Sequence, residues 1–355
     1  MSKARELAEL GAAYDSGALS NRNLIINGGM KISQRIGTTA TAITGGNYGL
    51  DRWLAYYLGN SYTTQQVTDA PSGFYNSMKL LVTGTTTPNY SFFGQKLEGN
   101  NVNQIGLGTA NCQSFTISFY VKSSVTGIYS ISVTNNSSAL SYPVQYTINS
   151  ANTWERKTMT IPAITSGTWE VGTGIGIFLR FNMGSPSSRT DTADGWRSGN
   201  FDGADGSTGS IAWATTSGAT FYMTGCQLEV GTEATPFEHR SFGDELARCQ
   251  RYYYEISGIN SLVGHGFYYG SNEVDVLVNL PVPMRASPSI TPSNNTNDFV
   301  FQHYTDTFNT WTGVQYYNGD SLNMYVTSDV SGTGGQAGYA RTNTSTGKIQ
   351  FSSEL

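Results

Sequence analysis

The sequence is poor in charged residues, basic clusters and long apolar runs. Charged residues make up 13% of the chain, against the ~25% that is usual in soluble globular domains. The net charge of −5 and the lack of any long Lys/Arg run argue against the basic face that binds nucleic acid. MSKARELAEL lacks the apolar centre of a signal peptide, and no apolar run is long enough to span a membrane. We therefore expect a soluble protein made in a cytoplasm, with no nucleic-acid partner and no membrane insertion.

Motifs of catalysis and of metal binding are also missing. The sequence has no HExxH, no GxSxG and no phosphate-binding glycine loop followed by a helix. The cysteines are few, widely spaced and without a CxxC pair, which indicates free, buried thiols: Cys112, Cys226 and Cys249. The histidines have no partner at a recognisable spacing, so we expect structural roles for them: His239, His265 and His303. The protein is not expected to be an enzyme.

Glycine, tyrosine and phenylalanine are abundant, with 41, 22 and 16 residues. Aromatic and β-branched residues fit a pleated sheet, while Gly and Asn supply turns. Apolar and polar residues alternate over residues 115–122 and again over 175–181. Short runs of this kind follow one another without long helical segments, which predicts an all-β protein with a jelly-roll sandwich over residues 21–242.

Two helical segments are expected to flank this sandwich. Residues 2–10 place Leu7 and Leu10 on one helix face, and we expect residues 1–20 to form a short helical anchor that docks on a neighbouring copy or on another protein. Residues 243–257 are expected to form a linking helix that leads into a second, smaller β-sandwich over residues 258–355. The tyrosines at 252–254 lie at this joint, and we expect them near a contact between domains or subunits.

Residues 182–216 form a polar, Gly-rich stretch that interrupts the strand pattern. A loop of this length is usually functional or disordered, and its aromatic residues argue against disorder. Aromatic rings stack on sugar rings and Arg donates to hydroxyl groups, so we predict a carbohydrate-binding surface from four residues of the loop: Trp196, Arg197, Phe201 and Trp213. The alternative for Trp213 is simple packing beneath the loop.

The same loop contains Asp-x-x-Asp-Gly twice. Carboxylates and loop carbonyls suit Ca²⁺, so a calcium site is a second hypothesis for four residues: Asp191, Asp194, Asp202 and Asp205. Asp-Gly pairs are also ordinary turn residues. A third possibility is that two of these carboxylates act as a glycosidase pair.

The segments NRNLIINGGMKISQR, YGLDRW, SFTISFYVKSSVTGIYSISV, TWERKTMTIP and GCQLEVGTEATPFEHRSFGDELARCQRYYY resemble a module of bacteriophage tail fibres and related virion proteins. The resemblance covers residues 1–255, and that module is similar to a carbohydrate-binding jelly roll. It implies a virion structural protein, a homotrimer and a host-surface glycan as partner. It carries no functional residues with it.

The main hypothesis is thus a phage tail fibre that residues 1–20 attach to other virion proteins. A capsid decoration or head-fibre protein is one alternative, and a glycan depolymerase is another. If the loop does not bind sugar, the next aromatic residues to consider are those of the C-terminal domain: Tyr268, Tyr269, Trp311 and Tyr316.

Overall fold

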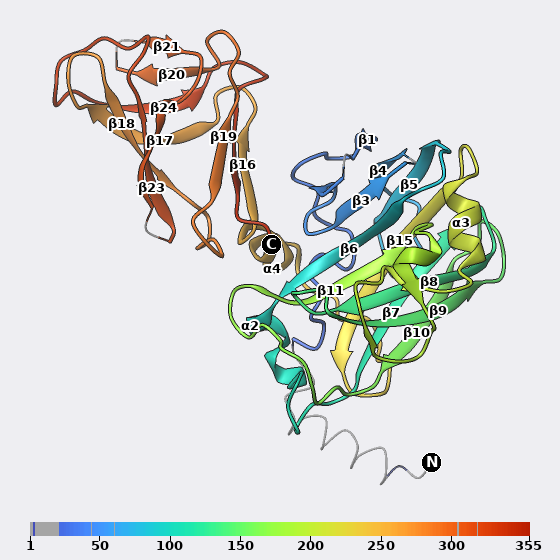
Figure 1. The fold of residues 1–355 in the computed structure, drawn as a ribbon. Helices are drawn as coiled ribbons and strands as arrows, with labels where there is room; N and C mark the ends of the chain where they lie inside the picture. Colours follow the sequence, from blue (N-terminus) through green and yellow to red (C-terminus); the bar gives the residue numbers. More distant parts are fainter. Residues whose placement is uncertain (1–2, 4–20, 44, 60, 304, 318) are drawn as a thin grey trace. The chain divides into compact units, whose positions relative to one another are not determined.

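The computed structural model describes residues 3, 21–43, 45–59, 61–303, 305–317 and 319–355. The chain divides into two compact units (Figure 1): unit 1 (Met1–Phe242, with Leu355) and unit 2 (Gly243–Glu354). Both consist mainly of antiparallel strands joined by turns, which confirms the all-β prediction. Lys3 apart, the helix expected at 2–10 and the anchor expected at 1–20 lie outside the described residues. Within the described ranges, no helix combines the length and the apolar character needed to cross a membrane.

Unit 1 is a sandwich of two facing sheets, which we name sheet A and sheet B. Across sheet A the strands run β1 (Thr41–Ala42), β4 (Ser61–Val67), β5 (Ser77–Gly84), β15 (Thr220–Val230), β7 (Phe115–Ser123) and β10 (Glu155–Ile161). Across sheet B they run β13 (Arg197–Ser198), β9 (Leu140–Ile148), β8 (Gly127–Thr134), β11 (Ile175–Asn182), β6 (Tyr90–Glu98), β3 (Leu54–Leu58) and β2 (Asn47–Tyr48). The helices α2 (Gly99–Val102) and η1 (Asn103–Ile105) follow β6.

The core of unit 1 lies between these sheets. Because side chains alternate along a strand, β7 buries Phe115, Ile117 and Phe119 on one face, as the sequence predicts. The ring of Phe119 contacts Phe181 of sheet B, with 5.0 Å between centroids. Phe221 of sheet A lies 5.7 Å from Phe93 of sheet B. These contacts across the sandwich show that the inner faces of both sheets form one core.

The stretch between β11 and β15 contains short regular elements. These are η2 (Ser187–Arg189), β12 (Thr190–Asp191), β13, β14 (Gly203–Ala204) and α3 (Thr208–Ala214). Strands β12 and β14 pair in parallel, and β13 adds to the edge of sheet B. The excursion expected to be irregular is therefore partly built into the sandwich.

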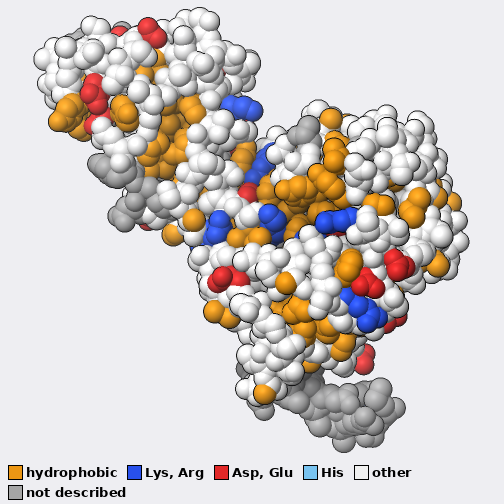
Figure 2. All heavy atoms as spheres, viewed as in Figure 1, with side chains coloured by type: hydrophobic (Ala, Val, Ile, Leu, Met, Phe, Trp, Pro, Cys, Tyr) orange, Lys and Arg blue, Asp and Glu red, His pale blue; other side chains and the backbone are white. Residues whose placement is uncertain are grey.

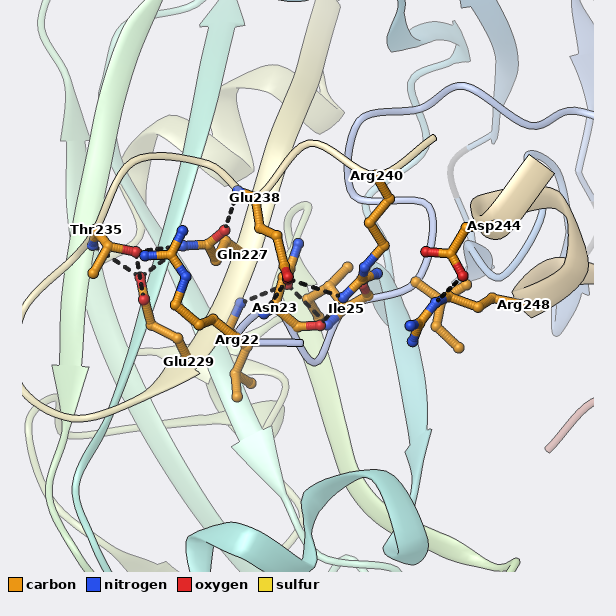
Figure 3. A network of polar contacts seen from close by, with 12 residues as sticks. Arg22, Asn23, Ile25, Gln227, Glu229, Thr235, Glu238, Arg240, Asp244 and Arg248 are labelled. Atoms are coloured by element: carbon orange, nitrogen blue, oxygen red, sulfur yellow. Dashed lines mark hydrogen bonds and ion pairs between the residues drawn. The ribbon is translucent and has the colours of Figure 1, made fainter. Parts of the chain in front are cut away.

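The first described segment of unit 1 is fastened to the last strand (Figure 3). Leu24 N donates to Leu228 O at 2.8 Å, and Cys226 N donates to Gly28 O at 3.0 Å. Asn23 joins the two segments through its side chain, whose Nδ2 donates to Cys226 O and whose Oδ1 accepts from Leu228 N. A Cβ at Gly28 would lie 2.0 Å from Cys226 O, so only glycine permits this close approach. We call the joined segments, residues 22–28 and 226–240, the clamp.

A buried arginine completes the clamp. Arg240 Nη1 donates to Ile25 O at 3.0 Å, and Nη2 donates to Asn23 O. Glu238 pairs with the same guanidinium at 3.4 Å and accepts from Asn23 N at 2.8 Å. The clamp thus explains the opening and closing motifs of unit 1, NRNLIINGG and GCQLEVGTEATPFEHR, as two halves of one structural feature.

Unit 2 has a small sheet and a larger one, which we name sheet C and sheet D. Sheet C runs β16 (Tyr253–Ser257), β25 (Lys348–Ser352) and β19 (Ser289–Pro292). Sheet D runs β21 (Asp306–Phe308), β20 (Phe299–Gln302), β24 (Ala337–Thr342), β17 (Leu262–Tyr268), β18 (Val274–Asn279), β23 (Ser321–Val326) and β22 (Gly313–Tyr317). Their shared core includes Val276, Phe301 and Ile349.

The linking helix is shorter than expected. Helix α4 (Phe242–Gln250) ends before the tyrosines, and Tyr253 and Tyr254 belong to strand β16. The ring of Tyr254 stacks on Phe351 of β25, 5.9 Å away. Tyr253 Oη donates to Glu255 and accepts from Gln350. Both tyrosines therefore have partners within sheet C. These contacts favour the strand conformation, so the helix ends earlier than the sequence pattern predicts.

A buried aspartate of unit 2, Asp298, accepts hydrogen bonds from two turns of the chain. Asp298 accepts hydrogen bonds from the Thr346 hydroxyl at 2.9 Å and from the backbone and side chain of Asn295. Thr344 also donates to it, at 2.5 Å. Burial alone would raise the pKa of Asp298, but these hydrogen bonds outweigh it and hold the pKa well below the ordinary value.

Replacing Asp298 by alanine is expected to lower the free energy of unfolding of unit 2 by about 2–4 kcal/mol, because several donors lose their acceptor. Since the folded-state pKa is depressed, the carboxylate stabilises the native unit above about pH 5, and this contribution disappears as the pH falls. Urea unfolding at pH 7 and pH 3 measures both effects. The matched control is Asp320→Ala, an exposed position in the same unit. Equal losses in the two variants would contradict the role of Asp298.

Candidate functional site

Trp213 is a core residue. It lies on α3 with 0% of its surface exposed, 5.6 Å from Tyr62 and 6.5 Å from Phe221 between ring centroids. A side chain without exposed surface cannot stack on a sugar. The expectation that Trp213 belongs to a carbohydrate surface is therefore wrong, and the alternative of packing beneath the loop holds.

The other three residues of the predicted sugar surface lie near the β9 edge of sheet B. The Trp196 ring packs against Tyr142 and Trp169, at 5.3 and 5.7 Å, and its indole N–H donates to Pro162 O. Arg197 Nε donates to Thr192 O at 3.3 Å. Phe201 is partly buried, and its backbone N–H donates to Ser141. Packing occupies part of the Trp196 ring and its N–H donor, but all three residues remain partly exposed, so sugar binding at this edge stays a prediction.

The four aspartates of the predicted calcium site have separate protein partners. Asp202 is fully buried and pairs with Arg180 at 3.1 Å and with Arg189 at 2.8 Å. Asp205 accepts from the Thr190 hydroxyl, and Asp191 accepts from Thr192 N. Asp194 contributes its backbone N–H to Pro143 O. Among the described residues no three His, Cys, Asp or Glu side chains are placed to hold a metal ion, so the structure does not form this group.

A different surface of unit 1 combines aromatic rings with cations: the outer face of sheet B. Cross-strand pairing places Tyr56 of β3 beside Phe92 of β6, and Lys96 of β6 beside Phe178 of β11. Arg180 lies two residues beyond Phe178 on the same face, opposite Gly94. We call this set, with Leu54, the aromatic face. Figure 2 shows hydrophobic side chains gathered over β3 and β6, with Lys and Arg side chains beside them.

The rings of the aromatic face contact one another and two cations. Tyr56 stacks on Phe92, with 5.5 Å between centroids and 22° between planes, and Phe92 meets Phe178 edge to face at 5.7 Å. The guanidinium of Arg180 lies 4.5 Å from the Phe178 centroid and 5.1 Å from that of Phe92. The Lys96 ammonium lies 5.7 Å from Phe178. Cation–π contacts of this kind fix the cations beside the rings.

Arg180 is held by the loop that follows β11. Its Nη1 donates to Asn200 Oδ1 at 2.5 Å and to Asp202 at 3.1 Å, and its Nη2 donates to Ser138 at 3.0 Å. Burial lowers the pKa of Arg180 to about 10, while the negative charge of Asp202 acts in the opposite direction. The guanidinium therefore remains protonated at neutral pH. The loop predicted to bind ligand instead holds an arginine of the neighbouring strand in place.

Polar groups without partners lie beside Arg180. Ser132 and Thr134 of β8 pair with Arg180 and Phe178 of β11. Within the described part of the chain, Arg180 Nε, Ser132 Oγ and Thr134 Oγ1 are buried without a hydrogen-bond partner. Unpaired buried polar atoms are unusual in folded proteins. These atoms lie beside the rings but beneath the surface, and they are not themselves exposed.

The sequence contained a signal for this face. A strand with one wet face alternates apolar and polar residues, yet β6 places Phe92 and Phe93 on opposite faces, and β11 does the same with Phe178 and Leu179. An arginine in the middle of such a strand, Arg180, is a second indication. Aromatic residues on both faces predict that the outer face contacts something other than water.

Comparisons with known proteins give fold likenesses only. No family model matches the sequence, and the comparison with curated proteins yields no match. Solved structures that resemble 55–59% of this chain include a bacteriophage CBA120 tailspike protein 4 domain (TM-score 0.33, 14% identity, 22% of that chain). A second is the CBM22-1 xylan-binding domain of Paenibacillus barcinonensis Xyn10C (TM-score 0.26, 10% identity, 98% of that chain). A third is the family 11 carbohydrate-binding module of Clostridium thermocellum Lic26A-Cel5E (TM-score 0.27, 17% identity, 98% of that chain). At such TM-scores these likenesses say nothing of what this chain binds.

Proposed function

We propose that unit 1 is a carbohydrate-binding module and that its aromatic face is the binding site. The observation that carries this proposal is the stack of Tyr56 on Phe92, with two cations held beside the rings of the face. A pyranose presents an apolar C–H face, which suits the partly exposed Tyr56 ring stacked on Phe92, and hydroxyl groups, which suit the partly exposed Lys96 ammonium beside Phe178. Binding sites with few polar groups on an otherwise apolar surface are typical of small ligands.

We propose further that the protein is a virion component, a tail fibre that attaches to host-surface glycan as a homotrimer and is fastened to other virion proteins through residues 1–20. The resemblance of NRNLIINGGMKISQR and GCQLEVGTEATPFEHR to segments of phage fibre proteins supports this role. Antibody labelling of virions followed by electron microscopy tests it. Label at the tail agrees with the proposal, whereas label at the capsid would favour a head fibre.

The proposed activity is binding and not hydrolysis. A glycosidase needs two carboxylates beside the sugar, one of which takes up and releases a proton. Asp202 pairs with Arg180 of the aromatic face, and both of its oxygens accept hydrogen bonds from arginine side chains. Asp202 is also fully buried, so it cannot reach a sugar on the surface.

Replacing Tyr56 by alanine tests the site. Loss of one stacking ring is expected to weaken glycan binding by about 1–2 kcal/mol, or roughly five- to thirtyfold in Kd, because the ring is partly exposed. A glycan array identifies a bound oligosaccharide, and titration calorimetry then compares the variants. Tyr75→Ala is the matched control, since Tyr75 is 75% exposed and lies in the connection between β4 and β5 of the same unit. Equal affinity of Tyr56→Ala and the native protein would refute the aromatic face as the site.

A further inference from the structure

Unit 2 has an exposed sheet face of its own. Strand β18 buries Val274, Val276 and Val278 in the core of the unit. Side chains alternate along a strand, so Asp275 and Leu277 lie on the opposite, outer face of sheet D. Figure 1 shows β17, β18 and β23 next to one another in this sheet. Leu277 is 47% exposed, and Phe267 of β17 is 44% exposed. An apolar outer face of this kind requires an explanation.

The strand register places an acidic residue between two aromatic ones. Asp275 of β18 pairs with Phe267 of β17 on one side and with Tyr325 of β23 on the other. The Tyr325 ring lies over Gly313 of β22, where an added Cβ would come within 3.0 Å of it. Glycine at this position therefore lets the ring lie over the sheet. The adjacent row continues the surface with Tyr339 and Leu277, which flank His265.

Asp275 is the polar group at the centre of this surface. The residue is 7% exposed, and its Oδ1 has no hydrogen-bond partner among the described residues. A buried carboxylate oxygen without a donor is unfavourable, and native proteins rarely keep one without a role. A carboxylate can only accept hydrogen bonds, so a ligand here must supply donors.

We propose that the outer face of sheet D is a second carbohydrate site, specific for an uncharged pyranose with adjacent hydroxyl donors. Phe267 and Tyr325 provide apolar rings for the C–H faces of the sugar, and Asp275 accepts from its hydroxyl groups. The negative charge disfavours acidic sugars by repulsion. A lysine or arginine side chain of a protein partner also supplies donors, but it covers less of the apolar area that Phe267, Leu277 and Tyr339 expose. This site is independent of the one proposed in unit 1.

Affinity electrophoresis of the full chain tests the proposal, with gels that contain dextran, mannan or galactan, and with polygalacturonate and polylysine as charged probes. The experiments use a Tyr56→Ala background, which weakens binding through unit 1. At least one neutral polysaccharide is expected to retard the protein. Asp275→Ala and Tyr325→Ala are each expected to raise the dissociation constant obtained from this retardation at least tenfold. Asp320→Ala, an exposed acidic residue of unit 2, serves as control and is expected to leave it unchanged.

Asp275→Ala removes an unpaired buried charge, so its melting temperature is expected to equal or exceed that of the parent. Lost binding with an intact melting transition then reports on the site and not on folding. Three results would overturn the proposal: no retardation by any neutral polysaccharide, retardation that Asp275→Ala leaves unchanged, or Asp275-dependent binding of polylysine alone.

Discussion

Replacing Arg240 by alanine is expected to lower the free energy of unfolding of unit 1 by about 3–5 kcal/mol. The guanidinium is buried and donates to the carbonyl groups of Ile25 and Asn23. Its removal leaves these acceptors without a donor and leaves Glu238 without its cation. Breaking a buried ion pair from one side is more harmful than never forming it, because the remaining charge stays desolvated. Differential scanning calorimetry measures the change.

Arg22→Ala is the matched control for Arg240→Ala. Arg22 belongs to the same clamp, but its guanidinium donates a long, exposed hydrogen bond of 3.5 Å to Pro236 O. Its loss is expected to cost less than about 0.5 kcal/mol, as for most surface substitutions. Similar destabilisation by the two variants would mean that the clamp does not depend on the buried guanidinium.

Trp213→Ala is expected to destabilise unit 1 by a similar amount, about 3–5 kcal/mol, through the large cavity it leaves. The indole packs between Tyr62 and Phe221, and it joins helix α3 to the core. The fluorescence-detected urea midpoint gives the change in stability, and a glycan titration under native conditions shows that binding is retained.

Ile211→Ala serves as the control for Trp213→Ala. Ile211 lies on the same helix and is 46% exposed, so truncation leaves no enclosed cavity and should cost about 1 kcal/mol or less. Loss of glycan binding by Trp213→Ala without loss of stability would contradict the core role of Trp213 and support a role in carbohydrate binding.

Strand positions could be predicted because a strand with one solvent-exposed face and one buried face alternates polar and apolar residues. The alternation at Phe115, Ile117 and Phe119 corresponds to β7, and the run from Ile175 corresponds to β11. In unit 2 the same period recurs in β18 (Val274–Asn279), which buries Val274, Val276 and Val278. Such local patterns survive folding because each strand buries its own apolar side chains.

Helix α3 was not predicted for a physical reason. Seven residues, TGSIAWA, are too few to show a helical period and too few to hold a helix alone in water. Packing of Trp213 and Ala214 into the core stabilises the helix, and that packing depends on strands distant in the sequence. The same reason explains why Trp213 resembled a surface residue in its polar, Gly-rich surroundings.

The aromatic face could not be assembled from the sequence, although its residues are conspicuous. Tyr56, Phe92 and Phe178 come from three strands, and only the register between β3, β6 and β11 makes them neighbours. Sequence reasoning favoured Trp196 because one loop placed several aromatic residues close together. Cross-strand register decides contacts of this kind, and one sequence gives little information about it.

The clamp and the position of β15 determine when unit 1 can finish folding during synthesis. β15 lies between β5 and β7 in sheet A, although both precede it in the chain. Until residue 230 has left the ribosome, these two strands lack their shared neighbour, and each presents an unpaired edge. The hydrogen bond from Asn23 to Glu238 can form only after a further 215 residues have been synthesised. At a translation rate of about 5–20 residues per second, this synthesis takes roughly 10–40 s. During that interval the nascent chain is open to wrong strand pairing, so we expect its yield to depend on translation speed and on chaperones that cover the β5 and β7 edges.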